Sequence, residues 1–332
     1  VPRHAGASAD DDGAQVAADM SRHWADLGET TFTTGIRFLG GVHRWFGRWP
    51  FRLCLYPVVL VYWMASGTAR RASLEYLRRL QSAHRVFARA PGGWTSLRHF
   101  ACFAETLLDK TLAMSGRYAH ERLVFDGVEP IVAHAVAGEG GLIITAHLGC
   151  LELLQASASW RPGFRINILV HTAHAQRFNR ILARLNPQAQ VQLLQVTAFD
   201  TATAMLLADR VAAGEWIAIA GDRIPVSGDR VVRISFLGRP AQFPAGPYLL
   251  ASLLQCPAYL MACTHEGAGY RARVHKLADR IKLPRPQREQ AMAAHAARFA
   301  HWIEQRLRES PLDWFNFYPF WDQPDHDASN PI

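Results

Sequence analysis

Short apolar runs alternate with helical segments over the last two thirds of the chain. The runs are rich in β-branched and aromatic side chains, which predicts strands at residues 142–145, 166–170, 191–196, 216–220, 231–236, 258–262 and 270–275. Apolar positions with a helical period lie between them, at residues 128–137, 151–159, 174–185, 201–213 and 245–255. This alternation predicts an α/β fold with a mixed, largely parallel sheet flanked by helices.

The first third of the chain is helical and basic instead. Amphipathic helices are expected over residues 68–89 and 94–114, and the first of these is rich in Arg. Before them, the uncharged apolar run from Leu53 to Ala65 is shorter than the ~20 residues that a membrane-spanning helix needs, and Pro57 is expected to break it. Arginines flank this run, which favours a segment lying at a membrane surface; a full span and a buried core helix are the alternatives.

These patterns predict four regions. Residues 1–17 lack any apolar period and are expected to form a disordered tail. Residues 18–116 form a helical, basic, membrane-associating region, and residues 117–321 form the α/β domain, in one continuous fold with that region. A long helix over residues 288–309 and an aromatic segment over residues 311–321 are expected to close the fold, before a tail over residues 322–332.

Composition and charge restrict the possible partners. Hydrophobic residues make up 49% of the chain and charged residues 19%, which is typical of a globular protein. The net charge of +8 favours anionic partners: membrane lipid, an acidic carrier protein or nucleic acid. No zinc-finger, RNP or basic-zipper pattern supports the nucleic acid alternative. The five cysteines are widely spaced and include no Cys-x2-Cys pair, which indicates buried thiols rather than disulfides or a zinc ribbon.

A histidine and a carboxylate flank one predicted strand-to-helix junction. His147 follows the apolar run at 142–145, Gly149 permits a sharp turn, and Glu152 lies in the first turn of the next helix. A carboxylate that accepts one ring N–H of a histidine leaves the other ring nitrogen free to take a proton. The pair therefore suits a general base and its orienting group, although a histidine that only satisfies a turn is the alternative.

A second polar pair follows the predicted strand at 216–220. Asp222 and Arg223 lie at its carboxyl end, where ligands gather in parallel sheets, so they could line the same crevice as His147. An arginine there could hold an anionic head group or a developing oxyanion. The alternative is an Asp–Arg pair that only braces a loop.

Three motifs together carry a resemblance to a known family. They are the His-x4-Glu motif of His147 and Glu152, the Gly-Asp-Arg turn at 221–223, and the Phe-Leu-Gly-Arg-Pro…Phe-Pro-x-Gly block at 236–246. The chain resembles the lysophospholipid and lipid A acyltransferase superfamily over about residues 24–321, and is most similar to the late lipid A lauroyl and myristoyl transferases. The resemblance implies an enzyme on the cytoplasmic face of the bacterial inner membrane.

The resemblance also implies roles for individual residues. His147 would be the general base and Glu152 its charge-relay partner, while N–H groups at Gly149, helped by Arg223 or Arg239, would stabilise the oxyanion. The acyl group would pass directly from acyl carrier protein or acyl-CoA to a hydroxyl or amine of a lipid or glycolipid, at an anionic membrane surface. No cofactor and no metal are implied.

The chain departs from the family pattern in three places. Cys150 stands where many relatives have Asn, which raises the rival possibility of an acyl-cysteine intermediate. The Phe-Pro-Ala-Gly-Pro stretch at 243–247 lacks the Glu and Arg of glycerol-phosphate acyltransferases, which argues against that acceptor. The aromatic ending at 314–321 replaces a basic tail and resembles enzymes of other acyl lipids, including aryl-polyene-type pigments. A catalytically inactive lipid-binding or carrier-docking protein is the alternative from another class.

Overall fold

The computed structural model describes Trp45 and residues 47–158, 164–170, 191–195, 200–224 and 230–322. Two compact units divide the chain, residues 1–58 and 59–332. Helix α3 (Arg48–Ala65) begins in the first unit and ends in the second. Pro57 lies inside this helix without interrupting it, so the break expected there is wrong; a proline removes only one hydrogen bond of the helix backbone. Among the described helices, none combines the length and apolar character needed to cross a membrane.

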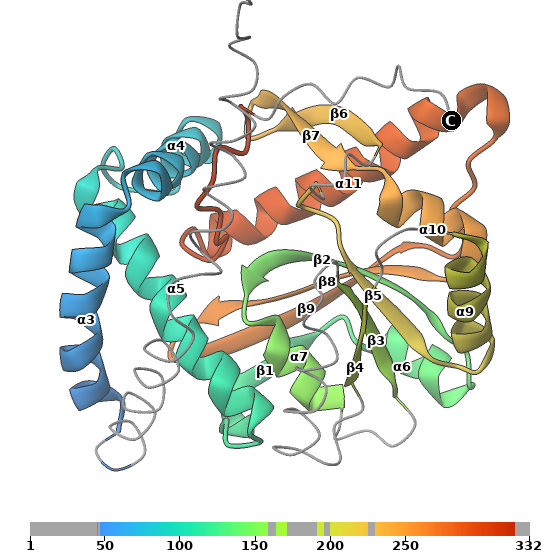
Figure 1. The fold of residues 1–332 in the computed structure, drawn as a ribbon, viewed down its shortest axis with the longest axis horizontal. Helices are drawn as coiled ribbons and strands as arrows, with labels where there is room; N and C mark the ends of the chain where they lie inside the picture. The colour runs from blue at the N-terminus through green and yellow to red at the C-terminus, as the bar shows by residue number, and fades with distance from the viewer. Residues whose placement is uncertain are drawn as a thin grey trace, which may run out of the picture. The chain divides into compact units, whose positions relative to one another are not determined.

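A seven-stranded mixed sheet forms the centre of the larger unit (Figure 1). Its strand order is β1-β9-β8-β2-β5-β3-β4. The strands are β1 (Leu123–Asp126), β2 (Gly141–Gly149), β3 (Ile166–Val170), β4 (Val191–Gln195), β5 (Trp216–Ala220), β8 (Ala258–Glu266) and β9 (Gly269–Ala278). Neighbouring strands pair in parallel except β8 and β9, which form an antiparallel hairpin. The predicted α/β class and its mixed, largely parallel sheet are confirmed.

Helices cover both faces of this sheet (Figure 1). The helices that share an apolar cluster with Ile143 of β2 are α5 (Gly93–Met114), α6 (Glu129–Val136) and α7 (Leu151–Ala158). The helices that share a second cluster with Ile144 are α4 (Gly67–His84), α9 (Thr201–Ala212), α10 (Gly246–Leu254) and α11 (Arg288–Glu309). Because successive side chains of a strand point to opposite faces, β2 supplies both clusters. The predicted helix at 174–185 lies outside the described residues.

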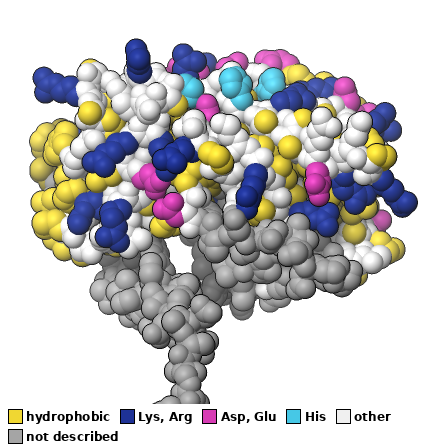
Figure 2. Space-filling model, turned by 90° about the horizontal axis from the view of Figure 1, so that it is seen from above, with side chains coloured by type: hydrophobic (Ala, Val, Ile, Leu, Met, Phe, Trp, Pro, Cys, Tyr) yellow, Lys and Arg dark blue, Asp and Glu magenta, His cyan; other side chains and the backbone are white. Residues whose placement is uncertain are grey.

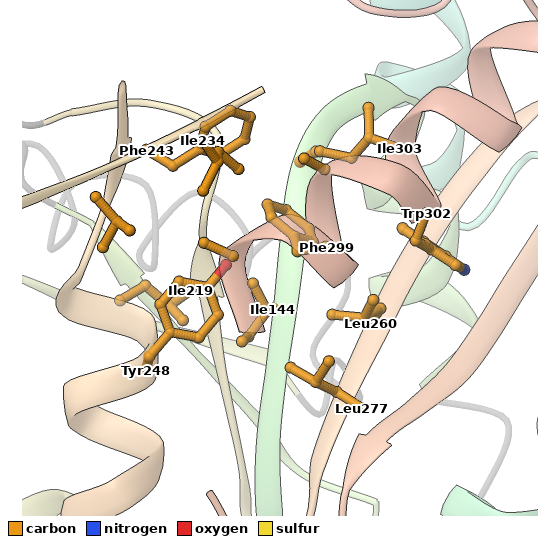
Figure 3. Packing of buried hydrophobic residues seen from close by; sticks show 14 of the residues in the cluster. Ile144, Ile219, Ile234, Phe243, Tyr248, Leu260, Leu277, Phe299, Trp302 and Ile303 are labelled. Carbon is orange, nitrogen blue, oxygen red and sulfur yellow. The ribbon is translucent and has the colours of Figure 1, made fainter. Parts of the chain in front are cut away.

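The larger cluster lies between the sheet and α11. Ile144 of β2 and Leu260 of β8 lie with Phe299 and Ile303 of α11 (Figure 3). Burying a side chain of this size stabilises the fold by roughly 1.5–3 kcal/mol. Strand β2 is buried on both faces, which explains why its sequence is a continuous apolar run rather than an alternating one. The strand that carries His147 is therefore firmly placed.

A separate hairpin packs against α11. Strands β6 (Val231–Phe236) and β7 (Arg239–Pro244) pair antiparallel through a turn at Leu237 and Gly238, both of which have positive φ. The backbone N–H of Leu237 donates to Glu304 of α11 at 2.7 Å. The sequence predicts β6 but not β7, because the two prolines of β7 disfavour a central strand and are tolerated only in an edge strand such as this one.

The basic helix α4, helix α5 and the aromatic segment complete the larger unit. Helix α4 (Gly67–His84) precedes α5, and the two pack together. The aromatic segment runs beside the end of β2, where Leu148 forms an antiparallel bridge with Trp314. The N–H of Phe315 donates to the carbonyl of His147 at 3.2 Å. We call residues 311–321 the closing segment; its predicted role in completing the fold is confirmed.

Candidate active site

His147 lies near the carboxyl end of β2, directly before a turn that requires glycine. Gly149 has φ +59°, and a Cβ at this position would lie 2.1 Å from the carbonyl oxygen of Cys263 on β8. Only glycine combines that φ with so close a backbone approach. The turn leads at once into α7, so His147 stands at a strand-to-helix junction as the sequence predicts.

The side chain of His147 forms a hydrogen-bonded pair with Asp222, which follows β5. Its Nδ1 lies 2.8 Å from Oδ1 of Asp222, and its backbone N–H donates to Oδ2 at 2.9 Å. Strands β2 and β5 are adjacent and parallel, which brings their carboxyl ends together. The structure thus brings Asp222 and His147 together, as their positions at strand ends predict.

Asp222 is buried but remains ionised. Burial alone would raise the pKa of its carboxyl group, but the charge and hydrogen bonds of His147, with the charge of Arg223, outweigh burial and lower the pKa to about 2. An ionised carboxylate only accepts hydrogen bonds, so the proton of the imidazole must be on Nδ1. The side chain of His147 is 38% exposed, and in the neutral imidazole Nε2 is the ring nitrogen that can take up a proton.

Trp314 of the closing segment holds the same carboxylate. Its indole Nε1 donates to Oδ2 of Asp222 at 3.0 Å, and the side chain is almost fully buried. Asp222 therefore accepts from three N–H groups, which fixes its position. Nothing in the sequence singles out Trp314 as a site residue, because it lies in an aromatic segment that stands out only as a departure from the family pattern.

Glu152 does not hold His147 in this structure. Its carboxylate lies 3.1 Å from Nζ of Lys110 on α5, and its Oε2 lies 3.9 Å from Sγ of Cys150. Asp222 occupies the position beside Nδ1 that the resemblance implied for Glu152. Glu152, in the first turn of α7, projects toward α5, whereas the end of β5 lies next to β2, so Asp222 and not Glu152 reaches His147.

The N–H groups at the Gly149 turn are not free to bind an oxyanion. Gly149 donates to the carbonyl of Asp313 at 2.8 Å, and Cys150 donates to the carbonyl of Cys263 at 2.9 Å. The implied role of Gly149 is therefore corrected: it shapes the turn and anchors the closing segment. The turn needs positive φ, and its amide is consumed in satisfying a buried carbonyl.

The two predicted arginines differ in their surroundings. Arg223 is exposed, donates to the carbonyl of Phe315 at 3.1 Å and lies over the ring of Tyr318, so it contacts the closing segment beside the site. Arg239 is also exposed, at the start of β7. Within the described residues, no hydrogen bond or ion pair joins Arg239 to His147 or Asp222, whereas Arg223 directly follows Asp222 and its charge acts on that carboxylate.

Cys150 is a buried thiol behind the turn. Burial, followed by the charge of Glu152, raises the pKa of this thiol far above its usual range. A protonated thiol is a poor nucleophile. The side chain therefore suits a packing role better than an acyl-cysteine mechanism.

The chain matches no protein-family model, and no curated protein matches its sequence. The fold and the site themselves define the class: an α/β protein with an oriented histidine at the carboxyl ends of its parallel strands. This position is where open α/β sheets bind their ligands.

Proposed function

We propose that this protein is an acyltransferase in which His147, oriented by Asp222, is the general base. The observation that carries the proposal is the 2.8 Å contact between Nδ1 of His147 and Oδ1 of Asp222, which leaves Nε2 as the proton acceptor. Nε2 would take the proton of a hydroxyl or amine as its oxygen or nitrogen attacks a thioester carbonyl. The C–S bond then breaks, and the imidazolium returns the proton to the leaving thiolate.

The acyl donor in this proposal is acyl carrier protein or acyl-CoA, and the acceptor is a lipid or glycolipid. The resemblance to lipid A acyltransferases supports this choice, with an aryl-polyene-type pigment lipid as the alternative acceptor. The net charge of +8 also favours anionic partners, and Lys and Arg side chains are spread over the surface shown in Figure 2. Among the described residues, Arg223 donates one hydrogen bond to the closing segment, and the other N–H groups of its guanidinium would serve oxyanion or head-group binding.

Membrane association belongs to the same proposal. Exposed apolar side chains occupy the end of α3 and the start of α5, namely Leu60, Val61, Tyr62, Met64 and Trp94. The basic helix α4 follows, and its Arg70 donates to the last carbonyls of α3 at 2.8 and 3.0 Å. Apolar side chains beside cationic ones suit binding at the surface of an anionic membrane. We expect the protein to sediment with anionic but not with zwitterionic vesicles. Equal recovery with both would contradict a contribution of the cationic side chains to membrane binding.

The test of function is acyl transfer by a His147→Ala variant. The assay supplies acyl carrier protein thioester and extracted bacterial lipids, and mass spectrometry identifies the acylated product. Removing a general base is expected to lower the rate by about 10²–10⁴-fold. Near-normal transfer by a folded His147→Ala protein would exclude His147 as the base, and no transfer by the wild type with any thioester would favour the inactive lipid-binding alternative.

A further inference from the structure

Three side chains from distant parts of the sequence converge beside the closing segment. They are Cys102 of α5, His265 of β8 and Asp313 of the closing segment. Sγ of Cys102 lies 3.4 Å from Oδ1 of Asp313 and 3.8 Å from Nδ1 of His265, and Nδ1 lies 2.6 Å from Oδ1. We call these residues the thiol–imidazole–carboxylate cluster.

This cluster is distinct from the site of His147. Both histidines place Nδ1 and their backbone N–H on one aspartate, but Asp222 takes its remaining hydrogen bond from an indole N–H. At Asp313 the third group is a thiol, and it contacts the oxygen that faces the imidazole rather than the one that accepts from the backbone N–H. An indole nitrogen cannot bind a cation, whereas sulfur, imidazole nitrogen and carboxylate oxygen are all metal ligands.

We propose that Cys102 Sγ, His265 Nδ1 and Asp313 Oδ1 bind one divalent transition-metal ion of the zinc class. Zinc binds thiolate at about 2.3 Å and imidazole or carboxylate at about 2.0–2.2 Å, so at the tetrahedral angle sulfur lies roughly 3.5–3.7 Å from nitrogen or oxygen, and nitrogen lies roughly 3.3–3.6 Å from oxygen. The two sulfur distances in the cluster are close to the first of these ranges. The nitrogen–oxygen distance must open by about 0.7–1.0 Å, which is the change expected when a metal ion replaces the shared proton.

The protonation balance of binding is simple. The thiol and the Nδ1–H of His265 each release one proton to solvent, the carboxylate releases none, and no electron is transferred. Without a cation the pKa of the Cys102 thiol is well above its usual range, because of burial and then the charge of Asp313. A bound cation reverses this effect by supplying the opposite charge.

The surroundings of the cluster hold its ligands in place and leave it accessible. The backbone N–H of His265 donates to Oδ2 of Asp313 at 2.6 Å, and its ring lies 4.1 Å from that of Tyr270. The side chain of His265 is 31% exposed, so one of the three ligands is in contact with solvent. Three protein ligands leave a fourth position for water. The sequence implied no metal because these ligands share no short spacing.

A metal ion at this position would tie α5, β8 and the closing segment together. The carbonyl of Asp313 accepts from Gly149, and the next residue, Trp314, holds Asp222. Metal binding would thus stabilise the segment that positions the orienting carboxylate of His147. The inference itself does not depend on acyl transfer, because it rests on a separate set of side chains.

The experiment is a cobalt titration of the full chain after reduction and removal of metals. We expect one equivalent of Co²⁺ to produce a thiolate-to-cobalt charge-transfer band, and native mass spectrometry to show one bound Zn²⁺. Cys102→Ser should abolish the band, while Cys54→Ser, which removes an exposed thiol elsewhere, and His147→Ala should keep it.

The outcomes separate the proposal from its alternatives. Absence of the band in the wild type, or its persistence in Cys102→Ser, would overturn the site. If Cys102→Ser fails to fold by circular dichroism, Asp313→Asn and His265→Gln replace it, and each must weaken Co²⁺ binding by at least tenfold. Retention of wild-type affinity in either folded variant would also overturn the proposal. A His147→Ala protein that keeps the cobalt band but loses acyl transfer would support the metal site and the proposed general base independently of each other.

Discussion

Replacing Asp222 by Asn changes the charge and the hydrogen-bonding pattern of the orienting group with almost no change in shape. In the wild type, Oδ2 accepts from two donors, the backbone N–H of His147 and Nε1 of Trp314, while Oδ1 accepts from Nδ1 of His147 alone. An amide has one accepting oxygen. We expect that oxygen to occupy the position with two donors, so that the NH₂ group faces Nδ1.

The expected consequence is a change of tautomer. An NH₂ group donates to Nδ1, which moves the ring proton of His147 to Nε2, the atom that must accept the proton of the acceptor. The same substitution in a serine protease triad lowers kcat by about 10⁴-fold. A general base contributes about 10²–10⁴-fold, so we expect a loss in this range, equivalent to roughly 3–5 kcal/mol of activation free energy. Loss of the charge-assisted hydrogen bonds should cost about 1.5–3 kcal/mol of stability.

Two measurements check this expectation. Initial rates of acyl transfer from a carrier-protein thioester give the loss of activity, and urea unfolding confirms that the variant is folded at the assay temperature. Nitrogen NMR of the histidine ring reports the tautomer independently of any substrate. In the wild type the proton should be on Nδ1, and in Asp222→Asn on Nε2.

Glu152→Gln is the matched control. Its carboxylate pairs with Lys110 at 3.1 Å between partly exposed side chains, so its removal should cost at most about 1 kcal/mol of stability and only a few-fold in rate. A loss within tenfold for Asp222→Asn, combined with a hundredfold loss for Glu152→Gln, would refute the geometric argument. It would restore Glu152 as the partner of His147 during catalysis.

Three further changes test the surroundings of this pair. Gly149→Ala should destabilise the protein by several kcal/mol in urea unfolding, because the new Cβ would meet a backbone carbonyl at a residue with positive φ. A cost below about 1 kcal/mol would contradict the requirement for glycine at this turn. Cys150→Ser should keep transfer within a few-fold, whereas complete loss in a folded protein would support the covalent route. The pKa of Asp222 is lowered to about 2, so its ionisation stabilises the fold fully above pH ~4. About 2–3 kcal/mol of unfolding free energy is lost as the pH falls toward 2. The difference in unfolding free energy between the wild type and Asp222→Asn should therefore shrink between pH 7 and pH 3, and a constant difference would exclude this linkage.

The strands could be predicted largely because the sheet is covered on both faces. A strand such as β5 (Trp216–Ala220), whose side chains are almost all buried, has a continuous apolar sequence bounded by polar turns. Its predicted bounds are the observed ones. Strand β2 extends to Gly149, well past the predicted end at residue 145, because His147 interrupts the apolar run although the backbone still pairs. Apolar patterns therefore report burial better than they report backbone pairing.

The partner of His147 could not be predicted in the same way. Sequence spacing relates Glu152 to His147 through one short turn, whereas Asp222 reaches it only because β5 lies beside β2 in the sheet. Strand order depends on how the connecting helices pack, and that information is spread over the whole chain. The sequence did place Asp222 at a strand end, which was the available signal. Trp314 had no such signal, since an indole in an aromatic segment gives no indication of its hydrogen-bond partner.

The closing segment connects the two histidine–aspartate pairs through consecutive residues. The side chain of Asp313 contacts His265, the side chain of Trp314 contacts Asp222, and the N–H of Phe315 contacts the carbonyl of His147. Because these groups belong to consecutive residues, we expect a displacement of Asp313 by about 1 Å to shift the indole that fixes Asp222. Catalytic geometry is sensitive to errors of this size. The segment that the sequence showed only as an aromatic ending is therefore the element on which both the proposed base and the proposed metal site depend.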